Sequence, residues 1–129
     1  MTGARSILAL MALAATALPA RAQTYAFECQ MLRNCSALLR DCTDVGEPRR
    51  YEIDLDASEG RIFYADAETP VVGYAYDDGI DLHMIMTNDL ATEFISFRPN
   101  GGIAHTGHLS RQDRFSIYWV EGDCEPVAP

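Results

Sequence analysis

The chain has 129 residues, of which 48% are hydrophobic, and its 10 basic residues are outnumbered by 19 acidic ones, giving a formal net charge of −9. This length predicts one domain, and the acidic balance argues against nucleic-acid binding, which requires a basic footprint. The same charge argues against anionic membrane surfaces and favours a cationic partner such as a basic protein or peptide.

Residues 1–22 have the pattern of an export signal. A positive charge at Arg5 precedes an apolar run over 7–18, and the A-R-A at 20–22 fits the cleavage site of signal peptidase. The run is too short to span a bilayer, which takes ~20 residues. We therefore predict a signal peptide over 1–22 and a single domain over 23–129. Every basic residue is arginine, as is typical of GC-rich bacterial genomes, so we expect a periplasmic or secreted bacterial protein.

The chain contains 4 cysteines, an even number that predicts two disulfides in an oxidising compartment. Three pairings are possible. We favour Cys35–Cys42, which would close the loop between the first two strands, and Cys29–Cys124, which would tie the first strand to the end of the chain. The spacing fits poorly with zinc sites, whose cysteine pairs lie two to four residues apart, and there is no C-x-x-C redox motif. We therefore expect no metal and no cofactor.

In the first half of the predicted domain, apolar and polar residues alternate in two segments. In 24–31 (TYAFECQM) the apolar side chains fall on one face, which is typical of a half-buried strand. The segment 32–48 lacks this alternation and contains two cysteines, a glycine and a proline, so it is predicted to be a disulfide-closed loop. The clearest strand is 49–56 (RRYEIDLD), with these side chains pointing inward: Tyr51, Ile53 and Leu55.

The second half continues with short strands separated by turn residues. A turn at 58–60 (SEG) leads into a strand over 61–65, and a further strand covers 71–76. The Asp-Gly at 78–79 predicts a type I′ turn before a strand over 80–87, in which Ile80 shares one face with the apolar residues that follow. The remaining predicted strands are 91–98, 103–109 and 115–121.

These segments amount to about eight short strands at regular spacing. Such a pattern predicts an all-β fold, either an antiparallel barrel or a sandwich, with a disulfide-closed loop after the first strand. No segment outside the predicted signal shows a helical stripe. If the last strand lies beside the first, Cys29–Cys124 would also protect an otherwise open edge.

Two motifs invite a metal interpretation. His105 and His108 are three residues apart, so on a regular strand they face opposite sides, and with His83 they are interpreted as surface histidines. The acidic segment 54–60 resembles the start of an EF-hand loop, but its glycine falls one position late and Ala65 stands where a glutamate is required. We interpret this segment as a solvated turn.

The sequence predicts no catalytic residues. There is no G-x-S-x-G motif, and no free cysteine remains once the disulfides form. The adjacent Tyr118 and Trp119 must face opposite sides of their strand, so one of them is exposed unless both faces are covered. An exposed aromatic residue in acidic surroundings would suit a protein-binding patch, whereas packing of both rings in a core is the interpretation that we favour.

Two resemblances extend these interpretations. The motifs Tyr25-Ala26-Phe27-Glu28-Cys29 and Gly122-Asp123-Cys124-Glu125 resemble those of small uncharacterised exported proteins of GC-rich bacteria. The segment 118–123 (YWVEGD) resembles a strand of the periplasmic and membrane-bound inhibitors of C-type lysozyme. That resemblance implies a small β-barrel whose first-strand cysteine pairs with one near the C-terminus. The inhibitory Ser-Gly loop of that family has no match before Arg50-Tyr51, so no inhibitory residue is transferred.

Together these features predict a non-enzymatic periplasmic domain that binds a basic protein or a small ligand. The alternatives are a lysozyme inhibitor and a hydrolase with an unrecognised site. A concave pocket lined by convergent histidine and carboxylate groups would favour the hydrolase, and a filled interior would argue against it.

Overall fold

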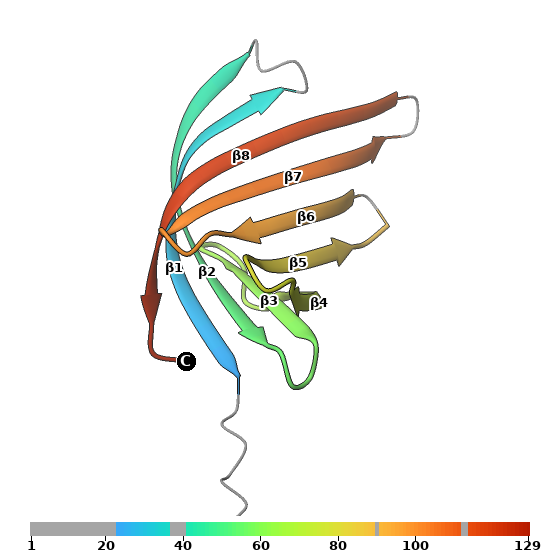
Figure 1. Cartoon of the computed structure of the whole chain (residues 1–129). Coiled ribbons are helices and arrows are strands. Elements are labelled where there is room, and N and C mark those ends of the chain that lie inside the picture. Colours follow the sequence, from blue (N-terminus) through green and yellow to red (C-terminus); the bar gives the residue numbers. More distant parts are fainter. Residues whose placement is uncertain (1–22, 37–40, 90, 112–113) are drawn as a thin grey trace, which may run out of the picture.

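The computed structural model describes residues 23–129 except 37–40, 90 and 112–113, so the predicted signal peptide over 1–22 lies outside the described residues. Eight antiparallel strands follow one another around a closed barrel, as Figure 1 shows. The strands are β1 (Thr24–Ser36), β2 (Cys42–Asp54), β3 (Glu59–Tyr64), β4 (Val71–Asp77), β5 (Leu82–Thr87), β6 (Ala91–Phe97), β7 (Gly102–Arg111) and β8 (Arg114–Val127). The all-β prediction is confirmed, and the architecture is a barrel.

The barrel closes where β8 pairs with β1, which leaves no open edge between the first and last strands. Cys29 lies directly opposite Cys124 in this pairing, and the two form a disulfide. A second disulfide joins Cys35 to Cys42, which are also opposite each other, on β1 and β2. Both favoured pairings are therefore confirmed, and each disulfide links neighbouring strands.

The prediction that residues 32–48 form one loop is wrong for most of the segment. Most of it is strand, because β1 continues to Ser36 and β2 begins at Cys42. The register shifts between Met31 and Arg33, and such a bulge moves the following side chains to the opposite face. This shift explains why the segment lacks the two-residue alternation although it remains paired.

Two turns also differ from the prediction. Residues 55–58 form the turn between β2 and β3, so Gly60 lies within β3. Between β4 and β5, Gly79 has a positive φ of 90° but Asp78 does not have a positive φ, which excludes the predicted type I′ turn. The register Asp77↔Leu82 leaves four residues in this loop, and Ile80 is 76% exposed there and does not face the interior.

Apolar side chains fill the middle of the barrel. Within this core, the Phe97 ring stacks on Phe27 with centroids 4.9 Å apart and meets Tyr51 edge-on at 5.1 Å. The buried apolar residues around them include Met31, Ile53, Ile62, Ala75, Met84, Met86, Ile95, Ile103 and Val120. The described part of the chain contains no helix long and apolar enough to cross a membrane.

The two ends of the barrel carry different connections. The chain enters β1 and leaves β8 at the same end, which we call the terminal end, together with the loops β2–β3, β4–β5 and β6–β7. At the opposite end β1 and β7 finish and β2 and β8 begin, and these four are the longest strands of the barrel.

Candidate functional site

Polar side chains gather inside the barrel between the apolar core and the opposite end. Each has the inward parity of a buried apolar residue two or, for Glu47, four positions along its strand, and side chains in a strand alternate between faces. This interior polar cluster consists of Glu47 and Arg49 on β2, Tyr64 on β3, Glu93 on β6, His105 on β7 and Tyr118 on β8.

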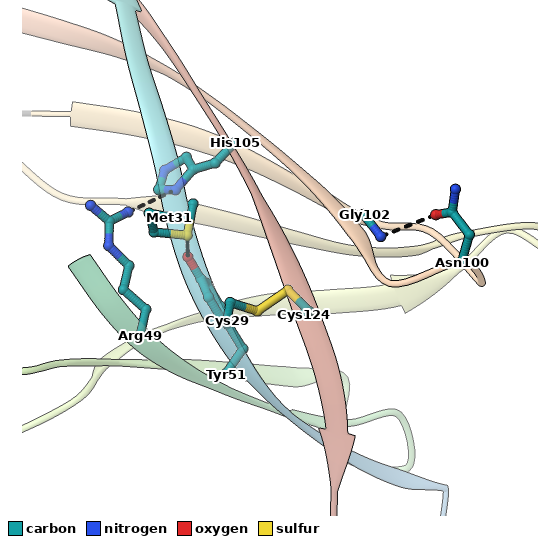
Figure 2. Close-up of a disulfide and its surroundings, with 8 residues drawn as sticks. All are labelled: Cys29, Met31, Arg49, Tyr51, Asn100, Gly102, His105 and Cys124. Atoms are coloured by element: carbon teal, nitrogen blue, oxygen red, sulfur yellow. Dashed lines mark hydrogen bonds between the residues drawn. A yellow bond between two sulfur atoms is a disulfide. The ribbon is translucent and has the colours of Figure 1, made fainter. Parts of the chain in front are cut away.

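His105 lies at the centre of the interior polar cluster and is fully buried. Figure 2 shows Arg49 reaching across the interior toward His105, and a nitrogen of its guanidinium, Nη1, lies 3.4 Å from Nδ1 of the ring. A guanidinium can only donate, so Nδ1 accepts and the proton of the ring lies on Nε2. This Nε2 is 3.4 Å from Oε1 of Glu93, although the two atoms are not aligned as a hydrogen bond.

Glu93 accepts a short hydrogen bond from the hydroxyl of Tyr118. Burial is the largest single influence on the pKa of Glu93 and raises it, but the contacts with His105 and Tyr118 and the nearby positive charges together lower the pKa below its usual value. Burial, followed by the bond to Glu93, raises the pKa of Tyr118. At neutral pH the carboxylate is therefore ionised and the phenol is a donor.

Arg49 balances these acidic groups. Its Nη2 donates to Oε2 of Glu47 at 3.1 Å, and its guanidinium lies 5.0 Å from the centroid of the Tyr64 ring, within the range of a cation–π contact. Burial tends to lower the pKa of Arg49, but the hydrogen bond to Glu47 and other neighbours raise it overall. The cation therefore sits between two carboxylates, those of Glu47 and Glu93.

The interior polar cluster brings histidine and carboxylate groups together, but in a filled interior. His105 is fully buried, and the side chains of Arg49 and Glu93 are only 11% and 13% exposed. A general acid or base must reach the substrate atom whose proton it moves. The geometry therefore supports a structural role next to the apolar core, in which Nε of Arg49 and Nε2 of His105 are buried without a hydrogen-bond partner among the described residues.

A cavity of about 340 Å³ opens at the terminal end. Its apolar floor includes the stacked rings of Phe27 and Phe97, together with Leu82 from β5. We call it the terminal-end cavity, and its remaining lining residues are Tyr25, Asp77, Gly79, Ile80, Asp81, Arg98, Pro99, Gly101 and Pro126.

The outer surface of the barrel has two chemically different sides. Among the described side chains of β4 to β7 and of β8 as far as Trp119, those that alternation directs outward include no Asp, Glu, Arg or Lys. We call this side the uncharged face, and its residues are Val72, Tyr74, Tyr76, His83, Ile85, Thr87, Thr92, Phe94, Ser96, Ala104, Thr106, His108, Ile117 and Trp119.

Four rings form a ladder across the uncharged face. Tyr74 stacks near Tyr76 with centroids 5.9 Å apart, and Tyr76 stacks on His83 at 4.9 Å. His83 in turn stacks on Phe94 at 5.3 Å. The ladder crosses from β4 to β6, so neighbouring strands present one continuous aromatic surface.

His83 fixes the ladder to the loop below it. One ring nitrogen lies 2.9 Å from the hydroxyl of Ser96 and the other lies 2.9 Å from a carboxylate oxygen of Asp78. The pKa of Asp78 is lowered to about 2 by three hydrogen bonds to its carboxylate. In order of size, they come from the backbone N–H of Asp81, the ring of His83 and the backbone N–H of Ile80. The Asp78 carboxylate is therefore ionised at neutral pH and ties the aromatic ladder to the β4–β5 loop.

The outer surface of β1 to β3 is, by contrast, strongly charged. Arg50 lies 3.7 Å from Glu28 and 3.0 Å from Glu52, and Arg61 pairs with Glu59 on the same strand. Exposed pairs of this kind contribute only about 0–1 kcal/mol each, so their main effect is to keep this side hydrated.

The structure separates the histidines that the sequence groups together. His105 and His108 face opposite sides of β7, as expected, and His108 is exposed. The interpretation as surface histidines is wrong for His105, which is inside the barrel, and for His83, which is covered by neighbouring rings. Within the described ranges, no group of three or more His, Cys, Asp or Glu side chains is placed to hold a metal ion.

The other predicted features have clear positions. The acidic segment 54–60 contains a turn in which the carboxylate of Asp54 accepts the N–H of Ala57 at 3.0 Å, as expected for a solvated turn. Tyr118 points inward and Trp119 outward, which confirms that they face opposite sides. The interior polar cluster was missed by the sequence analysis, although the inward parity of Arg49 with Tyr51 was a signal for it.

No protein-family model matches the chain, and a search of curated proteins also finds no match.

Proposed function

We propose that the protein is a non-enzymatic, exported binding domain that recognises a basic protein through its uncharged face. The observation that carries this proposal is the absence of charged side chains from that face, on a chain in which 22% of residues are charged. Solvation alone does not require such a separation, because charged residues are normally spread over a soluble surface.

The exposed side chains on this face are of the kind that dominates binding energy. Tyr74 is 53% exposed, Val72 51% and Phe94 40%. Val72 and Tyr74 lie on β4, and Phe94 lies on β6, on the far side of β5. Large exposed apolar patches usually mark an interaction site, and tyrosine is enriched among the residues that contribute most to interfaces. The ladder is also held rigid by stacking, so little side-chain freedom is lost on binding.

Charge identifies the class of partner. At the rim of the uncharged face, the last residue of β4 is Asp77 and the β4–β5 loop adds Asp78 and Asp81. The chain as a whole has a net charge of −9. Two copies of this chain would repel each other on approach, whereas a basic protein is attracted. A basic partner with apolar residues at its contact surface therefore fits both the face and its rim.

Site-specific photo-crosslinking tests this proposal in cells that export the protein. With p-benzoylphenylalanine in place of Tyr74, we expect adducts with a protein of basic isoelectric point. We expect Phe94→Ser to reduce their yield several-fold because it removes the ring at the other end of the ladder. The matched control carries the same crosslinker in place of Arg61 on the charged side, where no such adduct is expected. Ile80→Ser controls for the loss of an exposed apolar residue outside the face.

Equal crosslinking from positions 74 and 61 would contradict the proposal, as would an acidic partner captured from position 74. Retention of the full yield in Phe94→Ser would show that the aromatic ladder does not form the contact.

Inhibition of C-type lysozyme is the second candidate function. It is supported by the eight-stranded barrel and by the Cys29–Cys124 link between the first strand and the C-terminal strand, which the resemblance to those inhibitors implies. In a bacterial lysis assay, the purified protein in micromolar excess should slow lysis by a C-type lysozyme. Unchanged lysis would remove this candidate and leave the broader proposal of a basic partner in place.

A further inference from the structure

We propose that the terminal-end cavity binds a small amphipathic organic cation, meaning an aromatic or aliphatic body that carries one ammonium group. The terminal-end cavity lies at one end of the barrel, whereas the uncharged face lies on the outer surface of its strands. The inference therefore goes beyond the proposed protein-binding function and does not depend on it. The mouths of β-barrels are common places for small-molecule sites.

The size and floor of the cavity suit the apolar part of such a ligand. Its volume of about 340 Å³ falls at the lower end of the range for ligand sites, about 300–1,000 Å³. The stacked rings of Phe27 and Phe97 give a flat aromatic floor, and Leu82 extends it. An aromatic or branched aliphatic body would therefore bury its apolar surface against these three residues.

The charged groups at the rim select a cation. Asp77 and Asp81 face a single basic residue, Arg98, among the lining residues. Asp77 uses one carboxylate oxygen to accept the N–H of Gly79 at 2.6 Å. The side chains of Asp81 and Arg98 make no hydrogen bond or ion pair with other described residues. The rim therefore has an excess of negative charge that the protein does not neutralise.

The aromatic lining favours the same sign of charge. The face of an aromatic ring attracts a cation within about 6 Å of its centroid, and the ring of Tyr25, which is 38% exposed, lines the cavity. An anion would gain only from Arg98 and would be repelled by the carboxylates of Asp77 and Asp81. Both the carboxylates and the rings thus favour an ammonium group over a carboxylate.

Backbone hydrogen bonds hold the walls of the cavity in place. In the β4–β5 loop, one carboxylate oxygen of Asp78 accepts the N–H groups of Ile80 and Asp81, each at 2.9 Å. In the β6–β7 loop, the N–H of Cys124 donates to the carbonyl of Gly101 at 2.7 Å. Gly101 has a φ of +91°, and a side chain there would meet the Cys124 carbonyl. A wall fixed in this way loses little entropy when a ligand binds.

Three indoles that differ in charge test the proposal. Tryptamine, indole-3-propionate and 3-methylindole share a ring but are cationic, anionic and neutral. We expect tryptamine to bind about tenfold more tightly than the other two in calorimetry, as one favourable charge contact near a surface allows. Tryptamine should shift the backbone NMR signals of the β4–β5 and β6–β7 loops, and Arg98→Gln should strengthen its binding.

Matched variants separate the site from the general charge of the protein. Asp81→Asn removes a charge at the rim of the cavity, whereas Asp89→Asn removes one from the β5–β6 turn at the other end of β5. We expect the first to weaken tryptamine binding about tenfold and the second to change it less than twofold. Phe94→Ser, on the uncharged face, should leave tryptamine binding intact, so the two proposals can fail separately.

Three results would overturn this inference. They are binding of indole-3-propionate as tight as that of tryptamine, equal effects of Asp81→Asn and Asp89→Asn, and the absence of any tryptamine binding at millimolar concentration.

Discussion

Replacing both Cys29 and Cys124 with alanine is expected to lower the free energy of unfolding by about 4.7 kcal/mol on chain-entropy grounds. The disulfide joins residues 95 apart, so in the unfolded chain it closes a loop that spans almost the whole described domain. In the folded chain it lies in the seam between β1 and β8. Because domains of this size are stable by only about 5–15 kcal/mol, this loss would bring the barrel close to unfolding.

The matched control is the double variant Cys35→Ala and Cys42→Ala. Its disulfide joins residues only 7 apart, for which the same argument gives a loss of roughly 2.5 kcal/mol. Alanine is preferred to serine because Cys29 and Cys35 are buried, and a serine would place an unpaired hydroxyl in the interior. Unfolding in guanidinium chloride gives the free energy of unfolding of each double variant from the midpoint and slope of its transition. A larger loss from the short-loop pair would contradict the argument.

The strands could be predicted because most of the barrel alternates between an apolar interior and a polar exterior. Tyr51 and Ile53 show this pattern most clearly, and both are buried. The arms of the β1–β2 hairpin could not be found in this way. After the bulge at Met31, the side chains of β1 that would point inward point outward, and the reverse. The local sequence alone contains no sign of such a bulge. The disulfide pairing followed from the number and spacing of cysteines.

The interior polar cluster could not be predicted from alternation of apolar residues alone. A charged residue on a half-buried strand is normally exposed, and only its partners on other strands make burial favourable. Glu93 needs Tyr118 and His105, which come from two other strands of the barrel. The registers of β6 with β7 and of β7 with β8 bring these three residues together. Closure of the barrel then adds Arg49 from β2.

The uncharged face could be anticipated only in part. The outward position of Trp119 followed from its neighbour Tyr118, but the ladder of Tyr74, His83 and Phe94 depends on the pairing of β4, β5 and β6. In the sequence these residues are separated by 20 positions between the first and the last, and each belongs to a different predicted strand. Their relation is therefore visible only when the registers are known.

Glu93→Ala is expected to destabilise the barrel by about 3–5 kcal/mol, the usual loss when one partner of a buried charged network is removed. The change leaves the hydroxyl of Tyr118 without its acceptor and leaves Arg49 with Glu47 as its remaining carboxylate neighbour. The matched control is Glu52→Ala, whose carboxylate pairs with Arg50 on the outer surface and should contribute about 0–1 kcal/mol. Both variants lose one carboxylate, so a difference between their free energies of unfolding in guanidinium chloride measures the effect of burying that carboxylate.

The pH dependence provides a second and independent readout for Glu93. Its pKa in the folded protein lies below the usual value, so the carboxylate stabilises the fold above the unfolded pKa of about 4.3, and this contribution is lost as the pH falls through the folded pKa. The stability difference between the original chain and Glu93→Ala should therefore be largest near pH 7 and shrink by pH 3. A difference that stays constant or grows in acid would show that Glu93 acts through packing and not through its charge. In that case the hydrogen bond from Tyr118 to the Glu93 carboxylate would contribute little to stability, and Tyr118→Phe should then be as harmless as Glu52→Ala.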